Sequence, residues 1–228
     1  MRAAAAALLT LAALAVAGCG GGTKSNGEAT KTPAQVLRDV KQAAAGASSV
    51  HVAGTIVSSG QSIGLDLTMV RGKGGKGTLR LGTLSIDLVR LGGKAYIRGS
   101  DAFYTKFAGA AAAQLLHGKW LEGSATSGNF TAFVGLTDID KLIHQLVTGH
   151  GTATNAGETT YKGEKAVALN DKTQGGTLYI AATGSPLPLA IVGTKTGHTG
   201  TVTFTDWNAN ATVTAPAGAI DLSKLGSG

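Results

Sequence analysis

The chain has 228 residues, a formal net charge of +7, 5% aromatic residues and a single cysteine, Cys19. This length is sufficient for one substantial domain with its own core, and a single cysteine excludes an intramolecular disulfide. The basic residues are scattered along the chain rather than clustered. A mild positive charge suits an anionic lipid surface, but its scatter favours a role in solubility. The scarcity of aromatic rings for stacking on bases argues against a nucleic-acid partner.

The N-terminus has the layout of a secretory signal. Met1 and Arg2 give a short basic start, and residues 3–16 are apolar and carry no charge. This apolar run is shorter than the roughly 20 residues that cross a bilayer as a helix. The sequence therefore predicts export, with residues 1–18 as the signal peptide.

Residues 16–19, Val-Ala-Gly-Cys, resemble the bacterial lipobox, in which the cysteine thiol receives a diacylglyceryl group and becomes the first mature residue. The resemblance implies that Cys19 is lipidated and anchors the chain to a membrane. The alternative is a plain secretory signal with an incidental free thiol. Residues 19–32 are glycine-rich and polar, which predicts a flexible tether. Residues 33–228 then form a single domain at the outer face of the cytoplasmic membrane or elsewhere in the cell envelope.

The first predicted element is a helix over residues 33–45. Thr32 is a suitable N-cap, Pro33 suits the first helical position, and Gly46 ends the segment. After this helix the apolar period changes from 3.6 to 2. Alternation is visible in residues 49–57, 62–70, 78–91 and 94–99. Consecutive strands with no helix between them predict an antiparallel meander.

The middle of the chain returns to helical spacing, and its last third returns to alternation. Helical patterns cover residues 101–120, 127–136 and 136–149. Alternating runs rich in Thr and Val then cover residues 151–163, 164–171, 175–183, 186–195 and 199–208, followed by a loose tail. Helices set apart from an antiparallel sheet predict an α+β domain. A sheet with this many strands is expected to curl, which gives a concave apolar face for helices or a ligand to fill.

Two short patterns match motifs of known chemistry in an unsuitable context. Residues 72–77, GKGGKG, match G-x-G-x-x-G, which binds a pyrophosphate only where it opens a helix. Here residues 78–81 alternate as a strand, which predicts a hairpin loop instead. Residues 60–64, GQSIG, match the nucleophile elbow, but the strand continues after Ser62 instead of turning into a helix.

The remaining polar residues point to no catalytic chemistry. The five histidines show no metal-ligand spacing, and no pair of carboxylates has an obvious catalytic spacing. The sequence therefore predicts a protein that is not an enzyme and that holds no cofactor and no metal.

The order of elements resembles the actinobacterial LppX/LprAFG lipoproteins, which are related in fold to the periplasmic carriers of lipoproteins. The resemblance rests on the lipobox with its polar tether, and on the opening helix followed by residues 49–57. It continues through residues 95–107 and 118–123 to residues 203–208 and a proline-containing tail. It implies a half-barrel of antiparallel strands around helices, with an apolar cavity for an acyl lipid or glycolipid. A membrane transporter is a further candidate partner.

Apolar side chains on the strands and on the helical insert are the candidates for lining such a cavity. The candidates are Leu65, Leu67, Leu84, Ile86 and Leu88 on the strands, and Phe103, Phe107, Phe130, Phe133, Leu142 and Leu146 on the insert. The insert is the expected lid, because it interrupts the sheet and contains several glycines. The expected function is to bind acyl lipids and to carry or retain them at the cell envelope. The alternative is a surface lipoprotein whose helices fill the sheet and which binds another envelope protein.

Overall fold

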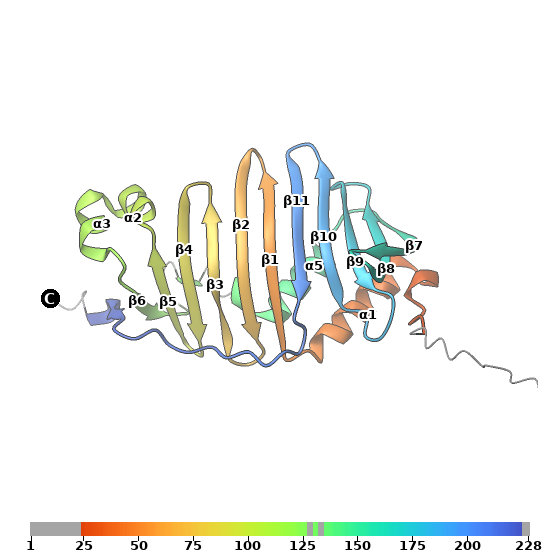
Figure 1. The fold of residues 1–228 in the computed structure, drawn as a ribbon, viewed down its shortest axis with the longest axis horizontal. Helices are drawn as coiled ribbons and strands as arrows, with labels where there is room; N and C mark the ends of the chain where they lie inside the picture. Colours follow the sequence, from red (N-terminus) through yellow and green to blue (C-terminus); the bar gives the residue numbers. More distant parts are fainter. Residues whose placement is uncertain (1–23, 127–129, 132–134, 225–228) are drawn as a thin grey trace, which may run out of the picture.

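The computed structural model describes residues 24–126, 130–131 and 135–224. These residues form one 12-stranded sheet with the order β12-β6-β5-β4-β3-β2-β1-β11-β10-β9-β8-β7 (Figure 1). The first strands are β1 (Ser49–Ser58), β2 (Gln61–Val70), β3 (Gly74–Leu81), β4 (Leu84–Leu91), β5 (Lys94–Gly99) and β6 (Leu121–Ser124). The others are β7 (Ala153–Tyr161), β8 (Glu164–Asp171), β9 (Gly176–Ala181), β10 (Pro188–Lys195), β11 (His198–Thr205) and β12 (Ile220–Asp221).

All neighbouring strands pair antiparallel except β12 and β6, which pair parallel. The two predicted blocks of strands are joined where β1 pairs with β11, with Val52 opposite Phe204. The antiparallel meander and the α+β class predicted from alternation are confirmed. The expected curl into a half-barrel stays a prediction.

Helix α1 (Pro33–Ala45) begins and ends where the sequence predicts. The Thr32 hydroxyl accepts a hydrogen bond from the backbone N–H of Gln35, and the Gln35 side chain accepts one from the backbone N–H of Thr32 (2.9 Å). This reciprocal capping box satisfies two donors that the first helical turn leaves unpaired. The apolar stripe of α1 packs Val36, Leu37 and Val40 against Leu169 of β8 and Ile180 of β9.

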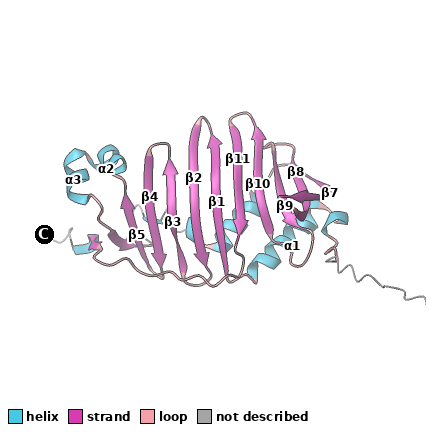
Figure 2. Ribbon diagram, viewed as in Figure 1, coloured by secondary structure: helices cyan, strands magenta, loops and turns pink. Residues whose placement is uncertain are grey.

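Helix α5 (Ile139–Thr148) lies on the same face of the sheet as α1, as Figures 1 and 2 show. We call this the helix side of the sheet. Asp138 caps α5 by accepting hydrogen bonds from the backbone N–H groups of Asp140 and Lys141, and Gly149 follows its end. Ile139 and Ile143 pack into the main core with apolar residues of β1–β4 and β11.

The first half of the helical insert consists of α2 (Asp101–Ala108) and α3 (Ala110–Leu116). A single helix was expected over this segment, but Gly109 adopts φ 88° and ψ 164°, a positive-φ conformation that favours glycine and breaks the helix. The two short helices lie at the β12 end of the sheet, where α2 contacts β4 and β5 (Figure 1). Most of the next expected helical turn, residues 127–136, lies outside the described residues.

The prediction of a hairpin loop over residues 72–77 is only partly correct. The turn spans residues 71–73, whereas Gly74, Gly75 and Gly77 belong to β3. Gly75 is buried beneath the short 3₁₀ helix η3 (Gly135–Thr137), where an added Cβ would lie 3.1 Å from the Thr137 Cβ. The glycines therefore let backbone pack closely on β3, and no helix follows them to hold a pyrophosphate.

The residues just before α1 are packed against the sheet. Ser25 forms a β-bridge with Thr183, and the Asn26 side chain donates to the carbonyl oxygen of Ala181 (2.8 Å). The 3₁₀ helix η1 (Glu28–Thr30) follows, with the Glu28 side chain buried. The segment predicted as a tether thus contributes its second half to the folded domain.

The tail that the sequence predicts as loose runs along the ends of the strands from β11 towards β6 (Figure 1). It buries Val213 against Val89 and Tyr96, then pairs β12 with β6 and ends in η4 (Leu222–Lys224).

Candidate functional site

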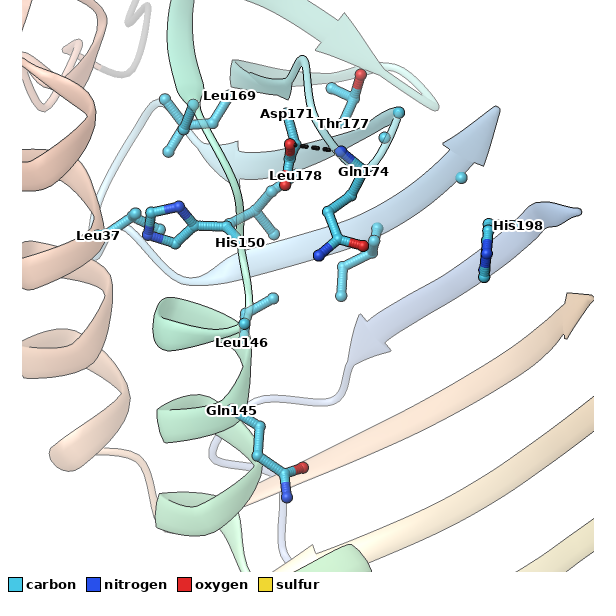
Figure 3. A pocket seen from close by; sticks show the side chains of 16 residues that line it. Leu37, Gln145, Leu146, His150, Leu169, Asp171, Gln174, Thr177, Leu178 and His198 are labelled. Carbon is cyan, nitrogen blue, oxygen red and sulfur yellow. Dashed lines mark hydrogen bonds between the residues drawn. The ribbon is translucent and has the colours of Figure 1, made fainter. Parts of the chain in front are cut away.

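A cavity of about 330 Å³ opens between the helix side of the sheet and the helices α1 and α5 (Figure 3). Its apolar lining comes from both layers of the fold: Leu37 of α1, Leu146 of α5, Leu169 of β8, Leu178 of β9 and Ile191 of β10. The helices supply one wall, and alternate residues of adjacent strands supply the other.

Cross-strand pairing explains why space remains above these strands. Leu178 lies opposite Ile191, and two residues further along the strands Gly176 lies opposite Gly193 and Gly193 opposite Gly200. Side chains two residues apart share a face, so this row of glycines lies on the cavity side. Without side chains, the glycines leave the room that leucines would otherwise fill.

The rim of the cavity is polar and contains no lysine or arginine. It includes Gln145 at the C-terminal half of α5, His150, Gln174 and His198. The His150 imidazole Nδ1 donates to the carbonyl oxygen of Gly151 (2.7 Å). An apolar interior with a polar rim that holds one carboxylate, Asp171, and no lysine or arginine suits an amphiphile whose head group exchanges hydrogen bonds.

Asp171 lies at the edge of the cavity, and its carboxylate is hydrogen-bonded to backbone N–H groups. Its carboxylate accepts hydrogen bonds from the backbone N–H groups of Gly151 (2.7 Å), Thr173 (2.8 Å) and Gln174 (2.8 Å). Burial raises the pKa of Asp171, but the hydrogen bonds from these three N–H groups outweigh burial, so the pKa lies below its usual value. Asp171 therefore holds the turn between β8 and β9, which borders the cavity.

Among the predicted lining residues that the structure describes, Leu146 borders this cavity and the others do not. Leu67 and Leu88 are buried in the main core, and Leu65 and Leu142 pack against it. Ile86 is buried and Leu84 is half-buried. Whether any of them contacts a lipid stays a prediction.

The aromatic candidates of the insert lie elsewhere. Phe103 packs against Tyr104 and Phe107, and Phe107 is 63% exposed. Phe130 is buried against Ala95 and Ala125. Phe133 lies outside the described residues.

Sequence reasoning missed the lining residues of α1 and of the second strand block. Leu178 and Ile191 both lie in alternating runs of the sequence. Each has a glycine two residues away on the same strand face, and this combination is the signal that could have indicated a cavity. The cross-strand register that aligns these glycines is fixed by long-range pairing and is not visible along the sequence.

The two motif-like patterns find no catalytic context in the described part of the chain. Ser62 is the second residue of β2 and pairs with Val57 across the hairpin, as the strand prediction requires. Within residues 24–126, 130–131 and 135–224, no group of three or more His, Cys, Asp or Glu side chains is placed to hold a metal ion. None of the helices in these ranges is long and apolar enough to cross a membrane.

No protein-family model matches the sequence, and no curated protein does. Among solved structures, LprF from Mycobacterium bovis matches with a TM-score of 0.56 and 18% identity, over 82% of this chain and 97% of that one. The lipoprotein LppX from Mycobacterium tuberculosis matches with a TM-score of 0.48 and 18% identity, over 80% of this chain and 98% of that one. A LolA superfamily protein from Nitrosomonas europaea matches with a TM-score of 0.28 and 8% identity, over 80% and 95%. The LprF match, the one of these above 0.5, shows that this chain is similar in fold to LprF over most of its length.

Proposed function

We propose that this chain is an exported lipoprotein, anchored through Cys19, that binds an acyl lipid in the cavity between α1, α5 and β8–β10. It carries or retains that lipid at the cell envelope and performs no catalysis. In this proposal the sheet curls around the helices as a half-barrel, and the lid is α5, the helix of the insert that borders the cavity; α2 and α3 lie too far along the sheet to cover it.

The observation that carries the proposal is the cavity, with its leucine and isoleucine lining and its polar rim. Transfer of each methylene from water into an apolar cavity is worth about 0.8 kcal/mol, so a chain of several methylenes binds without any catalytic or charged group. A volume of about 330 Å³ is at the lower end of the range for ligand pockets, which favours one acyl chain over several. The fold shared with LprF is consistent with this proposal.

The test is mass spectrometry under native conditions on residues 24–228, exported behind a cleavable signal peptide that lacks a lipobox and purified gently from the cell envelope. This part contains every described element and lacks Cys19, so no covalent anchor contributes a lipid signal. We expect a stoichiometric acyl lipid that dissociates on activation. A lipid-free protein that also fails to take up a fluorescent fatty acid would contradict the proposal and favour the protein-binding alternative.

A pair of tryptophan variants on β10 localises the site. Ile191→Trp adds bulk on the cavity side and should lower uptake of the fluorescent fatty acid at least tenfold. Thr194 is exposed and, by strand alternation, faces away from the cavity, so Thr194→Trp is the matched control and should bind as the unmodified chain does. Equal uptake by both variants would exclude this cavity as the binding site.

A further inference from the structure

At one end of the strands, exposed apolar and basic side chains lie together outside the cavity. Because the strands are antiparallel, the hairpin tips at residues 58–61, 81–84 and 195–198 lie along the same edge, where β5 also ends and leads into α2 (Figure 1). We call residues 58–61, 80–84, 100–119 and 195–198 the hairpin edge.

The hairpin edge carries the exposed large apolar side chains. Among the described residues, the large apolar side chains that are exposed are Leu81 (42%), Phe107 (63%) and Leu115 (77%), and all three lie here. Phe107 and Leu115 project from the short helices α2 and α3, next to an exposed stretch that includes Ala108 and Gly109. Exposed aromatic and leucine side chains grouped at one edge are unusual for a surface that meets only water.

Basic side chains accompany these apolar groups. Arg80, Lys106 and Lys119 are exposed, and the Lys106 Nζ lies 5.7 Å from the Phe107 ring centroid. Asp101, an acidic residue of this edge, is paired with His117, whose Nδ1 lies 2.8 Å from the carboxylate. Protruding apolar side chains flanked by lysine and arginine are typical of surfaces that insert into the interface of an anionic bilayer.

Part of the cavity lining lies at the same edge. Its lining includes Gly175 and Gly176 at the start of β9, Gly193 near the end of β10 and His198 at the start of β11. A bilayer that contacts the hairpin edge would therefore lie on the side of the cavity rim.

We propose that the hairpin edge docks on the surface of an anionic lipid bilayer, with Phe107 and Leu115 inserting among the head groups. This docking is separate from the Cys19 anchor and does not depend on whether the cavity holds a lipid. The basic residues provide electrostatic attraction, and the two apolar side chains provide the short-range contact.

The test measures the binding of residues 24–228, which lack the anchor, to anionic vesicles. The vesicles contain phosphatidylcholine with about 30% phosphatidylglycerol. We expect binding that weakens as salt rises, and a loss of at least about tenfold in the partition coefficient for Phe107→Ser/Leu115→Ser. Leu115→Ser alone is the safer variant, because this side chain is 77% exposed and its loss should leave the unfolding midpoint unchanged.

A matched pair of charge variants separates docking from net charge. Lys106→Ser/Lys119→Ser should weaken vesicle binding, whereas Lys41→Ser/Lys73→Ser removes the same charge away from the edge and should not. Failure of the unmodified domain to bind these vesicles, or full binding by Phe107→Ser/Leu115→Ser, would overturn the proposal. A dimer in light scattering that this variant dissolves, without vesicle binding, would assign the edge to self-association instead.

Discussion

The Asp171 carboxylate is a single residue on which the shape of the cavity edge depends. It accepts from three backbone N–H groups, two in the β8–β9 turn and one in the chain that leads into β7. These donors favour the charged form of the carboxyl group and lower its pKa. The charged carboxylate therefore stabilises the folded state.

We predict that Asp171→Asn lowers the free energy of unfolding by about 1 kcal/mol at pH 7, since an amide oxygen accepts these bonds more weakly than a carboxylate. The contribution of the charge is complete above the ordinary aspartate pKa of about 3.9 and is lost as the pH falls through the lowered folded-state value. Denaturant unfolding at a series of pH values should therefore show the variant and the unmodified chain converging in acid. The exposed Glu164 provides the control Glu164→Gln; a difference for Asp171→Asn that persists unchanged below pH 3 would contradict this account.

The glycines on the cavity side of β9 and β10 are a second feature at the scale of single residues. They border the cavity and also lie close to the backbone of neighbouring strands. A Cβ added at Gly193 would lie 2.7 Å from the carbonyl oxygen of His198, closer than such contacts allow. We expect Gly193→Ala to cost about 1–3 kcal/mol through displacement of β10 from β11.

Gly93 is the matched control for this prediction, because an added Cβ there meets nothing within 4 Å and its backbone is not left-handed. Gly93→Ala should leave the unfolding midpoint within about 0.5 kcal/mol of the unmodified chain. Equal stability of the two variants would show that β10 and β11 tolerate the extra atom, and that Gly193 serves only to keep the cavity open.

At the scale of elements, the contribution of the α1 capping box to the free energy of unfolding can be measured. Thr32→Ala removes the hydroxyl that accepts from Gln35, and we predict a loss of about 1 kcal/mol in the free energy of unfolding. Gln42→Ala, on the exposed part of the same helix, changes a side chain of similar polarity without touching the cap and should cost much less. Chemical denaturation of the two variants side by side tests this, because alanine favours the helix interior, and a comparable cost for both variants would contradict a specific contribution of the cap.

The same element shows which parts of the fold can be predicted from the sequence. Thr32, Pro33 and Gly46 define α1 because capping acts within a few residues, and alternation defines strands because each strand has a buried face. The break of the expected helix at Gly109 and the assignment of Gly74 to a strand were missed, because a glycine fits a loop and a closely packed strand equally well. Which strands pair is fixed by burial across the sheet, so the contact of β1 with β11 and the cavity between α1, α5 and β8–β10 appear only in three dimensions.

At the scale of the whole molecule, one arginine connects three elements that the chain separates. The Arg71 guanidinium follows β2 and donates to the carbonyl oxygens of Ala44 and Ala47 at the end of α1, and to the carboxylate of Asp140 in α5. Cationic groups at a helix C-terminus and carboxylates near a helix N-terminus are both electrostatically favourable, so Arg71 stabilises the two helices at the ends where they meet. This connection holds in place the two helices that form one wall of the cavity.

The segment before α1 joins the opposite end of α1 to the sheet, and its removal is the corresponding whole-molecule test. Asn155 of β7 donates to the carbonyl oxygens of Glu28 (2.9 Å) and Lys31 (2.8 Å), and the Lys31 ammonium bridges Glu28 and Asp39 at 2.7 Å each. Starting the chain at Thr32 deletes these acceptors along with the Ser25–Thr183 bridge, so the Asn155 side-chain amide nitrogen loses both of its acceptors. We predict that residues 32–228 unfold at a midpoint several degrees below residues 24–228 in a thermal scan, with Asn155→Ala in the longer chain reproducing part of the shift. Identical midpoints would mean that residues 24–31 contribute nothing to the stability of the fold, which would contradict the packing of this segment against the sheet.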